Sequence, residues 1–367
     1  MQNSSLLRTR RSLSGPRRSR FMGLAIAASA FIAVLAFASN AWAAYGATNL
    51  VSDIPGSARR TDSNLVNPWG IAVGSSGTIW VANNGTGTST LYDQNGVPQD
   101  LVVTIPASAT NTDGANPTGI VFNSGTGFVV SEGGVSGPAV FIFVSEDGSI
   151  SGWAPTVAAD HAIIAVDDGD EGAVYKGATL GDSSSGLRLF VTNFSEGKVS
   201  IYDDTFAEIE DEGAFVDPDI PSGYAPFGIQ NINGLIYVTY AKQDRDKEDD
   251  VPGPGHGFVS VFDADGNFIN RLASRGPLNS PWGLTLAPDR KFGNLTGALL
   301  VGNFGDGEIH GYDITTGALL GTMSKPDGTP LREDELWALH VIDNKVYFTA
   351  GIVEEEHGLF GYIEFHR

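Results

Sequence analysis

Short runs of aromatic and β-branched residues alternate with polar segments rich in Gly, Asn and Asp along the chain after residue 43. Segment 67–84, NPWGIAVGSSGTIWVANN, holds two such runs separated by a turn, and segment 280–304, SPWGLTLAPDRKFGNLTGALLVGNF, repeats the same order. Short apolar runs bounded by Gly and Asn predict β-strands, and the sequence shows no long helical pattern. The hydrophobic pattern therefore predicts a repeated unit built from strands.

The opening of this unit occurs six times along the chain. It reads PWGI, PTGI, YKGA, PFGI, PWGL and LWAL, starting at Pro68, Pro117, Tyr175, Pro226, Pro281 and Leu336. The mean spacing of about 54 residues exceeds that of WD repeats and is near that of kelch repeats. We place the starts of the six units near residues 67, 116, 173, 225, 280 and 336.

Each unit continues with a second run that ends in a small residue followed by a variable one, at Asn83, Glu132, Asn193, Tyr240, Asn303 and Ala350. A third run carries an aromatic residue and leads into a fourth through Asp-Gly or Asn-Gly turns, which are typical of tight hairpins. Four strands repeated six times predict an all-β fold, a six-bladed β-propeller of four-stranded antiparallel blades.

The last unit ends one strand short, because its final run, 359–365, is only its third. Segment 47–55 has no run before it to pair with, and it resembles fourth runs such as DLVVTIP, 100–106. We therefore expect the N-terminal strand to complete the last blade and close the ring.

The opening motif has a structural role in such a ring. Its glycine would lie where the innermost strands converge, and a missing side chain allows backbones to approach closely. These glycines are Gly70, Gly119, Gly177, Gly228 and Gly283. The neighbouring aromatic residues are interpreted as wedges between blades, with stacking on a carbohydrate as the alternative; they are Trp69, Phe227, Trp282 and Trp337.

The first 43 residues have the composition of a secretory signal peptide. Six arginines precede an apolar run, 21–38, which is followed by Ala41-Trp42-Ala43. The small-x-small pattern predicts cleavage after Ala43, so residues 44–367 would form a single propeller domain, secreted or periplasmic. A membrane anchor is the alternative, and Arg17-Arg18 raises twin-arginine export as a second route.

The charge and cysteine content exclude several classes of partner. The chain has 22 basic and 43 acidic residues, a net charge of −21, and cleavage would remove six arginines and no acid. Such an acidic protein is not expected to bind nucleic acid or to insert stably into a membrane, since those contacts need basic or long apolar surface. Without cysteine there are no disulfides or thiolate metal sites. We expect a monomer.

The ends of the second runs are the first candidate site. Equivalent positions around a ring point into the same space, so Asn83, Glu132, Asn193, Tyr240 and Asn303 are expected to converge at the channel mouth. Convergent amides and carboxylates there could bind a cation or a small polar ligand. The alternative is that these side chains satisfy backbone groups at strand ends.

Two inserted loops are the second candidate. Segment 242–257 carries His256 and segment 353–358 carries His357; either could act as a base or ligand, together with His340, if the three cluster. Asp244, Asp246 and Glu248 alternate as the hard oxygen ligands of Ca²⁺ do. An EF-hand is rejected, because Asp249 and Gly255 stand where it needs Gly and Glu. A looser Ca²⁺ site and a solvated charged loop remain open.

An enzymatic function finds less support in the sequence. There is no Gly-x-Ser-x-Gly motif, no cysteine and no His-Glu-x-x-His motif. A metal-dependent hydrolase of the lactonase kind would need a Glu, an Asn and an Asp to converge in the channel. Glu132, Asn193 and Asn303 are available, but their spacing does not match the signatures of propeller lactonases.

Several motifs occur together in a characteristic order: NPWGIAV, YVTYAKQD, HGFVSVFD, SPWGLTLAP, LLVGNFGDGEIHGYD and EHGLFGY. In this the chain resembles uncharacterised secreted bacterial six-bladed propellers related to NHL-repeat proteins, some of which carry a PEP-CTERM sorting signal. The resemblance implies fold and export but no activity. Since the sequence ends at Phe365-His366-Arg367 without a Pro-Glu-Pro motif, sorting by that route is not expected.

The sequence therefore predicts a propeller that binds a small molecule, a glycan or a protein at the face bearing segment 242–257. The metal-dependent hydrolase and a self-associating structural matrix protein are the alternative functions.

Overall fold

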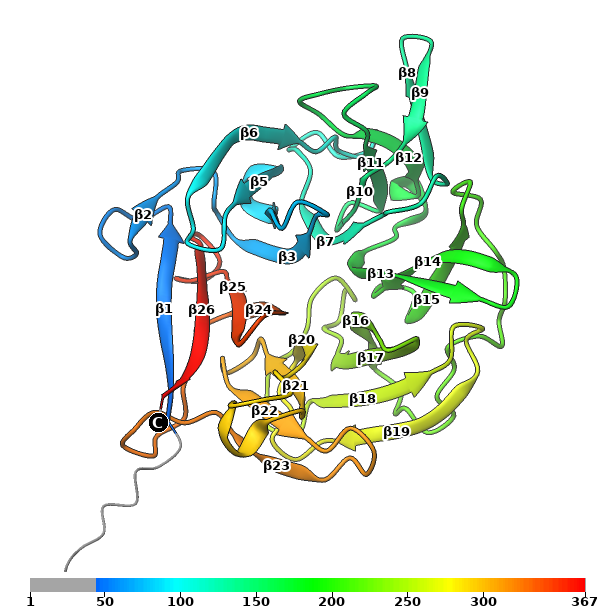
Figure 1. Cartoon of the computed structure of the whole chain (residues 1–367). Helices are drawn as coiled ribbons and strands as arrows, with labels where there is room; N and C mark the ends of the chain where they lie inside the picture. The colour runs from blue at the N-terminus through cyan, green and yellow to red at the C-terminus, as the bar shows by residue number, and fades with distance from the viewer. Residues whose placement is uncertain (1–43, 367) are drawn as a thin grey trace, which may run out of the picture. The chain divides into compact units, whose positions relative to one another are not determined.

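The computed structural model describes residues 44–366. Its strands form six small sheets arranged in a ring, each sheet being one blade (Figure 1). The described residues contain only three short 3₁₀ turns besides strands and loops, at Asn84–Thr86, Gly169–Glu171 and Gly293–Leu295. The predicted all-β, six-bladed propeller is confirmed.

Blades one, two and three contain the first eleven strands of the ring and one separate hairpin. Blade one holds β3 (Pro68–Val73), β4 (Ile79–Asn83), β5 (Thr88–Tyr92) and β6 (Pro98–Thr104). Blade two holds β7 (Pro117–Phe122), β10 (Phe141–Ser145), β11 (Ser149–Trp153) and β12 (Ile163–Asp167), while β8 (Val129–Glu132) and β9 (Val135–Pro138) pair only with each other. Blade three holds β13 (Tyr175–Ser183), β14 (Gly186–Asn193) and β15 (Lys198–Asp203).

Blades four and five have the regular four strands, and blade six takes strands from both ends of the chain. Blade four holds β16 (Tyr224–Ile232), β17 (Leu235–Lys242), β18 (Gly257–Phe262) and β19 (Phe268–Ser274). Blade five holds β20 (Pro281–Leu286), β21 (Leu299–Asn303), β22 (Ile309–Tyr312) and β23 (Leu319–Thr322). Blade six holds β24 (Leu336–Ile342), β25 (Lys345–Ala350), β26 (Leu359–His366), β1 (Ala44–Ser52) and the short β2 (Arg60–Thr61).

The ring closes where β1 pairs antiparallel with β26, from Ala44 opposite His366 to Ser52 opposite Leu359 (Figure 1). Leu50 and Val51 of β1 are fully buried, and they pack with residues of blades one and six in a single hydrophobic cluster. The N-terminal strand therefore completes the last blade, as predicted, and its buried side chains hold the two ends of the chain together.

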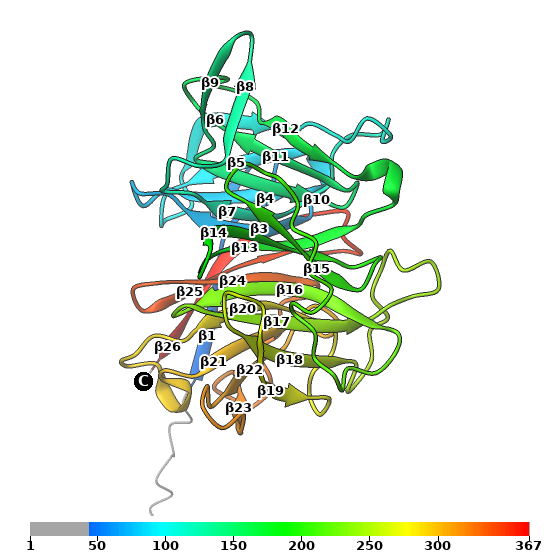
Figure 2. The same ribbon diagram turned by 90° about the vertical axis from the view of Figure 1, so that its right-hand side faces the viewer.

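The prediction that segment 129–132 is the second strand of blade two is wrong. That segment is β8, one arm of a hairpin that protrudes from the ring (Figure 1 and Figure 2). The second strand is β10, whose five residues are all buried, whereas Val129 is 50% exposed. The Val129-Val130 pair fits a strand pattern equally well in a blade and in a protruding hairpin. Gly133 and Gly134, both at positive φ, form the tight turn between β8 and β9.

Blade three differs from the predicted four-stranded pattern, because the structure shows only β13, β14 and β15 in its sheet. Residues 204–223, which follow β15, form no strand before β16 begins at Tyr224.

The innermost strands meet at the glycines of the opening motif. A Cβ atom on Gly228 would lie 2.1 Å from the carbonyl oxygen of Trp282, and one on Gly283 would lie 2.4 Å from that of Trp337. Adjacent inner strands are therefore packed backbone to backbone, as predicted. The aromatic side chains beside these glycines gather on the ring axis, where the centres of the stacked Trp69 and Trp337 rings lie 3.3 Å apart.

No helix within residues 44–366 has the length and apolar content that a membrane span requires.

Candidate functional site

Three of the predicted mouth residues are bonded within or beside their own blades. Asn83 donates to the hydroxyls of Thr88 and Thr90 in the next strand. Asn193 accepts hydrogen bonds from the loop that follows it, including one from Ser195 Oγ at 3.0 Å. Asn303 donates to the carbonyl of Pro277 at 2.8 Å and contacts His310. Asn303 thus satisfies a backbone carbonyl, whereas Asn83 and Asn193 bond to side-chain hydroxyls.

Tyr240 and Glu132 lie elsewhere. The Tyr240 side chain is 4% exposed and packs between blades three and four, where it lines a cavity beside β15. Glu132 lies on the protruding hairpin, and both its carboxylate oxygens are 3.1 Å from Nε2 of His161. The hydrogen bond with Asp160, followed by that with Glu132, raises the pKa of His161. The side chains at the five second-run positions therefore have different surroundings and share no hydrogen-bond partner among residues 44–366.

The three histidines have separate surroundings. His256 Nδ1 lies 2.8 Å from the carbonyl oxygen of Val251 within its own loop. His357 Nδ1 lies 2.6 Å from Oδ2 of Asp53 at the seam between the chain ends. His340 lies on β24, along the inner channel beside Gln230, and burial lowers its pKa to about 4. These histidines share no partner with one another.

The acidic residues proposed for Ca²⁺ do not form a ligand set in the described part of the chain. Asp244 accepts a hydrogen bond from the backbone of Glu248 at 3.1 Å, which shapes the turn of the inserted loop. Among residues 44–366 no group of three or more His, Cys, Asp or Glu side chains is arranged to hold a metal ion. The three acids lie on a small hairpin in which Gln243 pairs with Asp250.

Two residues that do converge lie just after the last residue of the second strand of their blades. Asn84 follows Asn83, and Glu146 takes the corresponding place in blade two, after Ser145. The Asn84 side chain donates to Glu146 Oε2 at 2.7 Å, across the boundary between the two blades. Successive side chains of a strand point to opposite sides. When one residue points into the blade interior, the next one therefore points toward the channel mouth.

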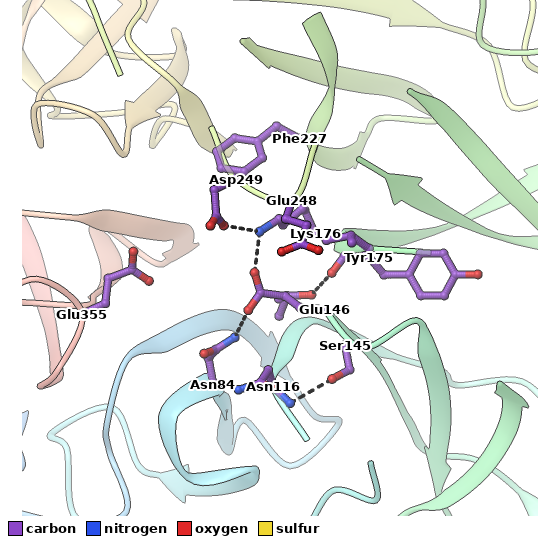
Figure 3. Close-up of polar contacts among 12 residues, drawn as sticks. Asn84, Asn116, Ser145, Glu146, Tyr175, Lys176, Phe227, Glu248, Asp249 and Glu355 are labelled. Atoms are coloured by element: carbon purple, nitrogen blue, oxygen red, sulfur yellow. Dashed lines mark hydrogen bonds and ion pairs between the residues drawn. The ribbon is translucent and has the colours of Figure 1, made fainter. Parts of the chain in front are cut away.

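Lys176 is the centre of this group. It takes the place in blade three that Trp69, Trp282 and Trp337 hold in other blades, and its side chain is 2% exposed. Its ammonium pairs with Glu146 and lies 3.2 Å from Oδ1 of Asp249 (Figure 3). Burial opposes the charge, but the two carboxylates more than offset it, so the pKa of Lys176 lies above its usual value.

Aromatic rings form the floor beneath this ammonium. It lies 5.4 Å from the centre of the Trp69 ring and 5.8 Å from that of Phe194, both within cation–π range. The Trp282 indole donates to the backbone carbonyl of Lys176 at 2.9 Å. The aromatic residues are thus structural wedges, as interpreted from the sequence, and they also support the one buried cation on the axis among residues 44–366.

The hydrogen bonds continue from blade one into blade six. Asn67 donates to Asn84 Oδ1 at 3.3 Å and to Glu355 Oε2 at 2.7 Å, and its own oxygen accepts from the Trp337 indole. Burial, together with the nearby Glu146 and Glu335, raises the pKa of Glu355 to about 7. We call the connected residues the mouth network: Asn67, Asn84, Glu146, Lys176, Asp249 and Glu355. All of them except Asn67 are labelled in Figure 3.

A polar pocket of 610 Å³ opens beside the mouth network. Its walls come from blade two, from the loop before β13 and from the inserted loop 242–257, which contributes Glu248 and Asp249. The other polar lining residues are Thr110, Asn111, Asn116, Glu146 and Asp147. The pocket lining contains neither a basic nor an aromatic side chain.

One feature of the sequence could have indicated this site. Lys176 replaces an aromatic or small residue of the opening motif, and a charged residue at a position that its repeats bury needs a partner of opposite charge. No pattern in the sequence indicates that the partners are Glu146 and Asp249, because they lie 30 and 73 residues away.

Comparison with known proteins supports an NHL-related propeller. The NHL repeat family model matches residues 65–89, which span the opening of blade one. The fold is similar to a streptogramin B lyase, with 14% identity and a TM-score of 0.51 over 88% of this chain and 97% of that chain. It is also similar to a catalytically inactive virginiamycin B lyase from Staphylococcus aureus with quinupristin, with 13% identity and a TM-score of 0.51 over 87% and 98%. Identities this low show the fold alone.

Two proteins of Acanthamoeba polyphaga mimivirus are related over most of their length. Uncharacterized protein R648 is 34% identical over 322 residues, which are 86% of this chain and 78% of that protein. Uncharacterized protein L690 is 34% identical over 314 residues, 83% of this chain and 81% of that protein. These relatives are viral, so they give no support to the bacterial part of the resemblance. The chain belongs to the same family as these two mimivirus proteins, a family whose fold is here an NHL-related six-bladed propeller.

Proposed function

We propose that this protein is a binding module whose ligand is a small, positively charged molecule bearing amine or guanidinium groups. The ligand would lie in the 610 Å³ pocket between blades two and three and the inserted loop 242–257. The observation that carries the proposal is the composition of this pocket, because carboxylates and amides line it and no basic side chain does.

The inserted loop supplies one carboxylate that is free to meet a ligand, Glu248, and a second, Asp249, that pairs with Lys176 but is largely exposed. Within blade two, Asp147 is already bonded to the backbone of Ser108 and Ser149, and Glu146 is paired with Lys176. The Glu248 side chain has no hydrogen-bond or ion-pair partner among residues 44–366, and Asp249 is 75% exposed. An ammonium between the loop and blade two would therefore meet unpaired charge of opposite sign.

The pocket favours this class of ligand over the two others expected from the sequence. Sugars commonly stack on aromatic rings, and none lines this pocket. A protein partner would require a larger, more apolar surface than these polar walls provide. The net charge of −21 also raises the local concentration of cations at a concave acidic surface.

Calorimetric titration of the protein with spermidine and with L-arginine amide tests the proposal, with glycerol as the neutral probe. We expect binding of the two cations that weakens as salt is raised. In Glu248→Gln/Asp249→Asn the affinity should fall at least tenfold, while Asp246→Asn, an exposed change on the same loop, should leave it unchanged. No binding of either cation, or equal affinity in the double variant, would overturn the proposal.

We do not propose the metal-dependent hydrolase. It requires Glu132, Asn193 and Asn303 to face one reacting centre. Glu132 instead lies on the protruding hairpin beside His161, and the two asparagines bond within or beside their own blades.

We also propose that the protein is exported and acts outside the cytoplasm. The predicted signal, 1–43, lies outside the described residues. Strand β1 begins at Ala44, so cleavage after Ala43 would leave every described strand intact. N-terminal sequencing of the protein from the extracytoplasmic fraction should give AYGAT; an N-terminus that retains residues 1–43 there would contradict cleavage.

A further inference from the structure

The fourth strand of blade three begins and then stops. After β15, the chain turns back beside it, and Asp203 N donates to the carbonyl of Ala207 at 2.9 Å. Ile209 N then donates to the carbonyl of Ile201 at 2.8 Å. These are the first two bonds that a fourth strand would make. Between Ile209 and the start of β16 at Tyr224, the described chain makes no further backbone bond with β15.

The chain departs because Phe215 is anchored elsewhere. Phe215 is 5% exposed, and its ring lies 4.9 Å from that of Phe190 in blade three and 5.3 Å from that of Phe262 in blade four. Its backbone N–H donates to Gly266 at the turn between β18 and β19. Segment 210–215 therefore crosses toward blade four instead of continuing along β15.

The departure leaves backbone groups of β15 without partners. Alternate residues of an antiparallel strand face opposite neighbours. Since Ile201 and Asp203 bond outward, away from β14, Val199 also faces outward. Among residues 44–366, no group bonds to the N–H or C=O of Val199 or to the N–H of Ile201. Val199 is only 7% exposed, and unpaired polar groups at such a depth are rare in folded proteins.

A cavity of 380 Å³ occupies the place of the missing strand. The edge residues Val199 and Ile201 line one side of it, and segment 208–217 lines the other. Tyr240 of blade four also lines the cavity, and its hydroxyl is buried without a hydrogen-bond partner among the described residues. A ligand in this cavity would thus find both backbone groups and a side-chain hydroxyl available.

The acidic side chains that line the cavity favour a positively charged ligand. Acidic side chains line it at Glu208, Glu210, Asp211, Glu212 and Asp217. The lysine that lines it, Lys198, pairs with Glu196 and lies 3.7 Å from Glu208. Asp217 is neutralised by Arg271. Glu210 and Glu212 have no ion-pair partner among residues 44–366, so the cavity has an excess of negative charge.

We propose that this cavity binds an extended segment of another polypeptide carrying lysine or arginine, which completes the fourth strand of blade three. Strand addition at a sheet edge satisfies the unpaired backbone groups and lets alternate side chains provide specificity. The unpaired stretch from Lys198 to Ile201 spans about 13 Å at roughly 3.3 Å per residue, enough for about four ligand residues. This site lies apart from the mouth pocket and does not depend on the function proposed for it.

The test uses capped pentapeptides and the whole protein. The probe is acetyl-Val-Lys-Val-Lys-Val-amide, compared with the same peptide carrying glutamate for lysine and with one N-methylated at alternate backbone nitrogens. We expect the lysine peptide to bind, and both comparison peptides to bind at least tenfold more weakly. Amide hydrogen exchange at Val199 and Ile201 should slow in its presence, which binding elsewhere on the surface would not produce.

Two variants complete the experiment. Glu210→Lys/Glu212→Lys changes exposed side chains and should abolish binding, whereas Asp100→Lys/Asp113→Lys, which makes the same charge change elsewhere on the surface, should not. Ala214→Trp fills the cavity and should also block binding, whereas Ala207→Trp on the exposed part of the same segment should not. Absence of binding by the lysine peptide, or binding without slower exchange at Val199 and Ile201, would overturn the proposal.

Discussion

The ammonium of Lys176 lies 3.2 Å from Oδ1 of Asp249, although the lysine side chain is 2% exposed and the aspartate side chain is 75% exposed. The second partner, Glu146, is 25% exposed. The ion pair between Lys176 and Asp249 thus joins the ring axis to the inserted loop. The two carboxylates are expected to contribute unequally to stability, because solvent weakens an exposed ion pair far more than a buried one.

Glu146→Ala should destabilise the protein by about 3 kcal/mol, since it leaves the buried Lys176 charge with only a solvated partner. Asp249→Ala should cost less than about 1 kcal/mol, because most of that carboxylate is already in water. Urea unfolding of both variants measures the difference. The double variant Lys176→Met/Glu146→Leu removes both charges and should recover most of the loss; equal costs for Glu146→Ala and Asp249→Ala would contradict the assignment.

Stability should depend on pH through Glu355. Burial raises its pKa to about 7 in the folded protein, against an ordinary value of 4.5. Between these values the folded state binds more protons than the unfolded state, so this group makes the free energy of unfolding fall as pH rises. Above pH 7 the accumulated loss, relative to the stability below pH 4.5, is about 3 kcal/mol.

Glu355→Gln should therefore stabilise the protein at pH 8 and change it little at pH 4, while its amide oxygen still accepts the bond from Asn67. Urea unfolding across this range measures the difference between variant and parent. Glu356→Gln, at an exposed neighbouring position, is the control. A difference that is the same at both pH values would show that Glu355 is not the group responsible.

The close approach of the inner strands predicts a graded response to Gly→Ala changes. A methyl group on Gly228 would lie 2.1 Å from the Trp282 carbonyl oxygen, and one on Gly177 would lie 3.2 Å from the Phe227 carbonyl oxygen. Gly228→Ala should therefore cost about 3 kcal/mol and Gly177→Ala about 1 kcal/mol or less. Thermal unfolding of both variants gives the order, and a Gly177→Ala variant as unstable as Gly228→Ala would disagree with this packing.

The seam between the chain ends contains a buried carboxylate, Asp53, and removing this side chain should lower the stability of the protein. Asp53 accepts hydrogen bonds from His357 Nδ1 at 2.6 Å and from the backbone N–H of Gly358 at 2.8 Å. Asp53→Ala leaves the buried Gly358 donor unpaired and should lower the free energy of unfolding by about 1–3 kcal/mol. Asp100→Ala, at an exposed position on β6, should have almost no effect. Equal urea midpoints for the two variants would exclude a role for Asp53 at the seam.

The sequence by itself determined the repeat. The spacing of the opening motif and the alternation of apolar runs with Gly and Asn predict six blades, because strands and tight turns depend on local residue types. The same pattern predicts that β1 completes the last blade, since the final unit lacks one strand and segment 47–55 has the form of one. The glycines of the inner strands could also be interpreted from the sequence, because close backbone approach requires that residue type.

Only the tertiary structure decided which polar residues meet. Asn83 and Asn84 are both plausible mouth residues in the sequence, and the direction in which each side chain points depends on where the strand ends and how the blade is oriented. Glu132 fits a strand pattern, but the burial of Phe141–Ser145 places it on a hairpin instead. Lys176, Glu146 and Asp249 come from three blades, and their pairing arises from long-range packing that no local pattern contains. The unfilled edge of β15 likewise depends on Phe215 packing against blade four, a contact between residues far apart in the sequence.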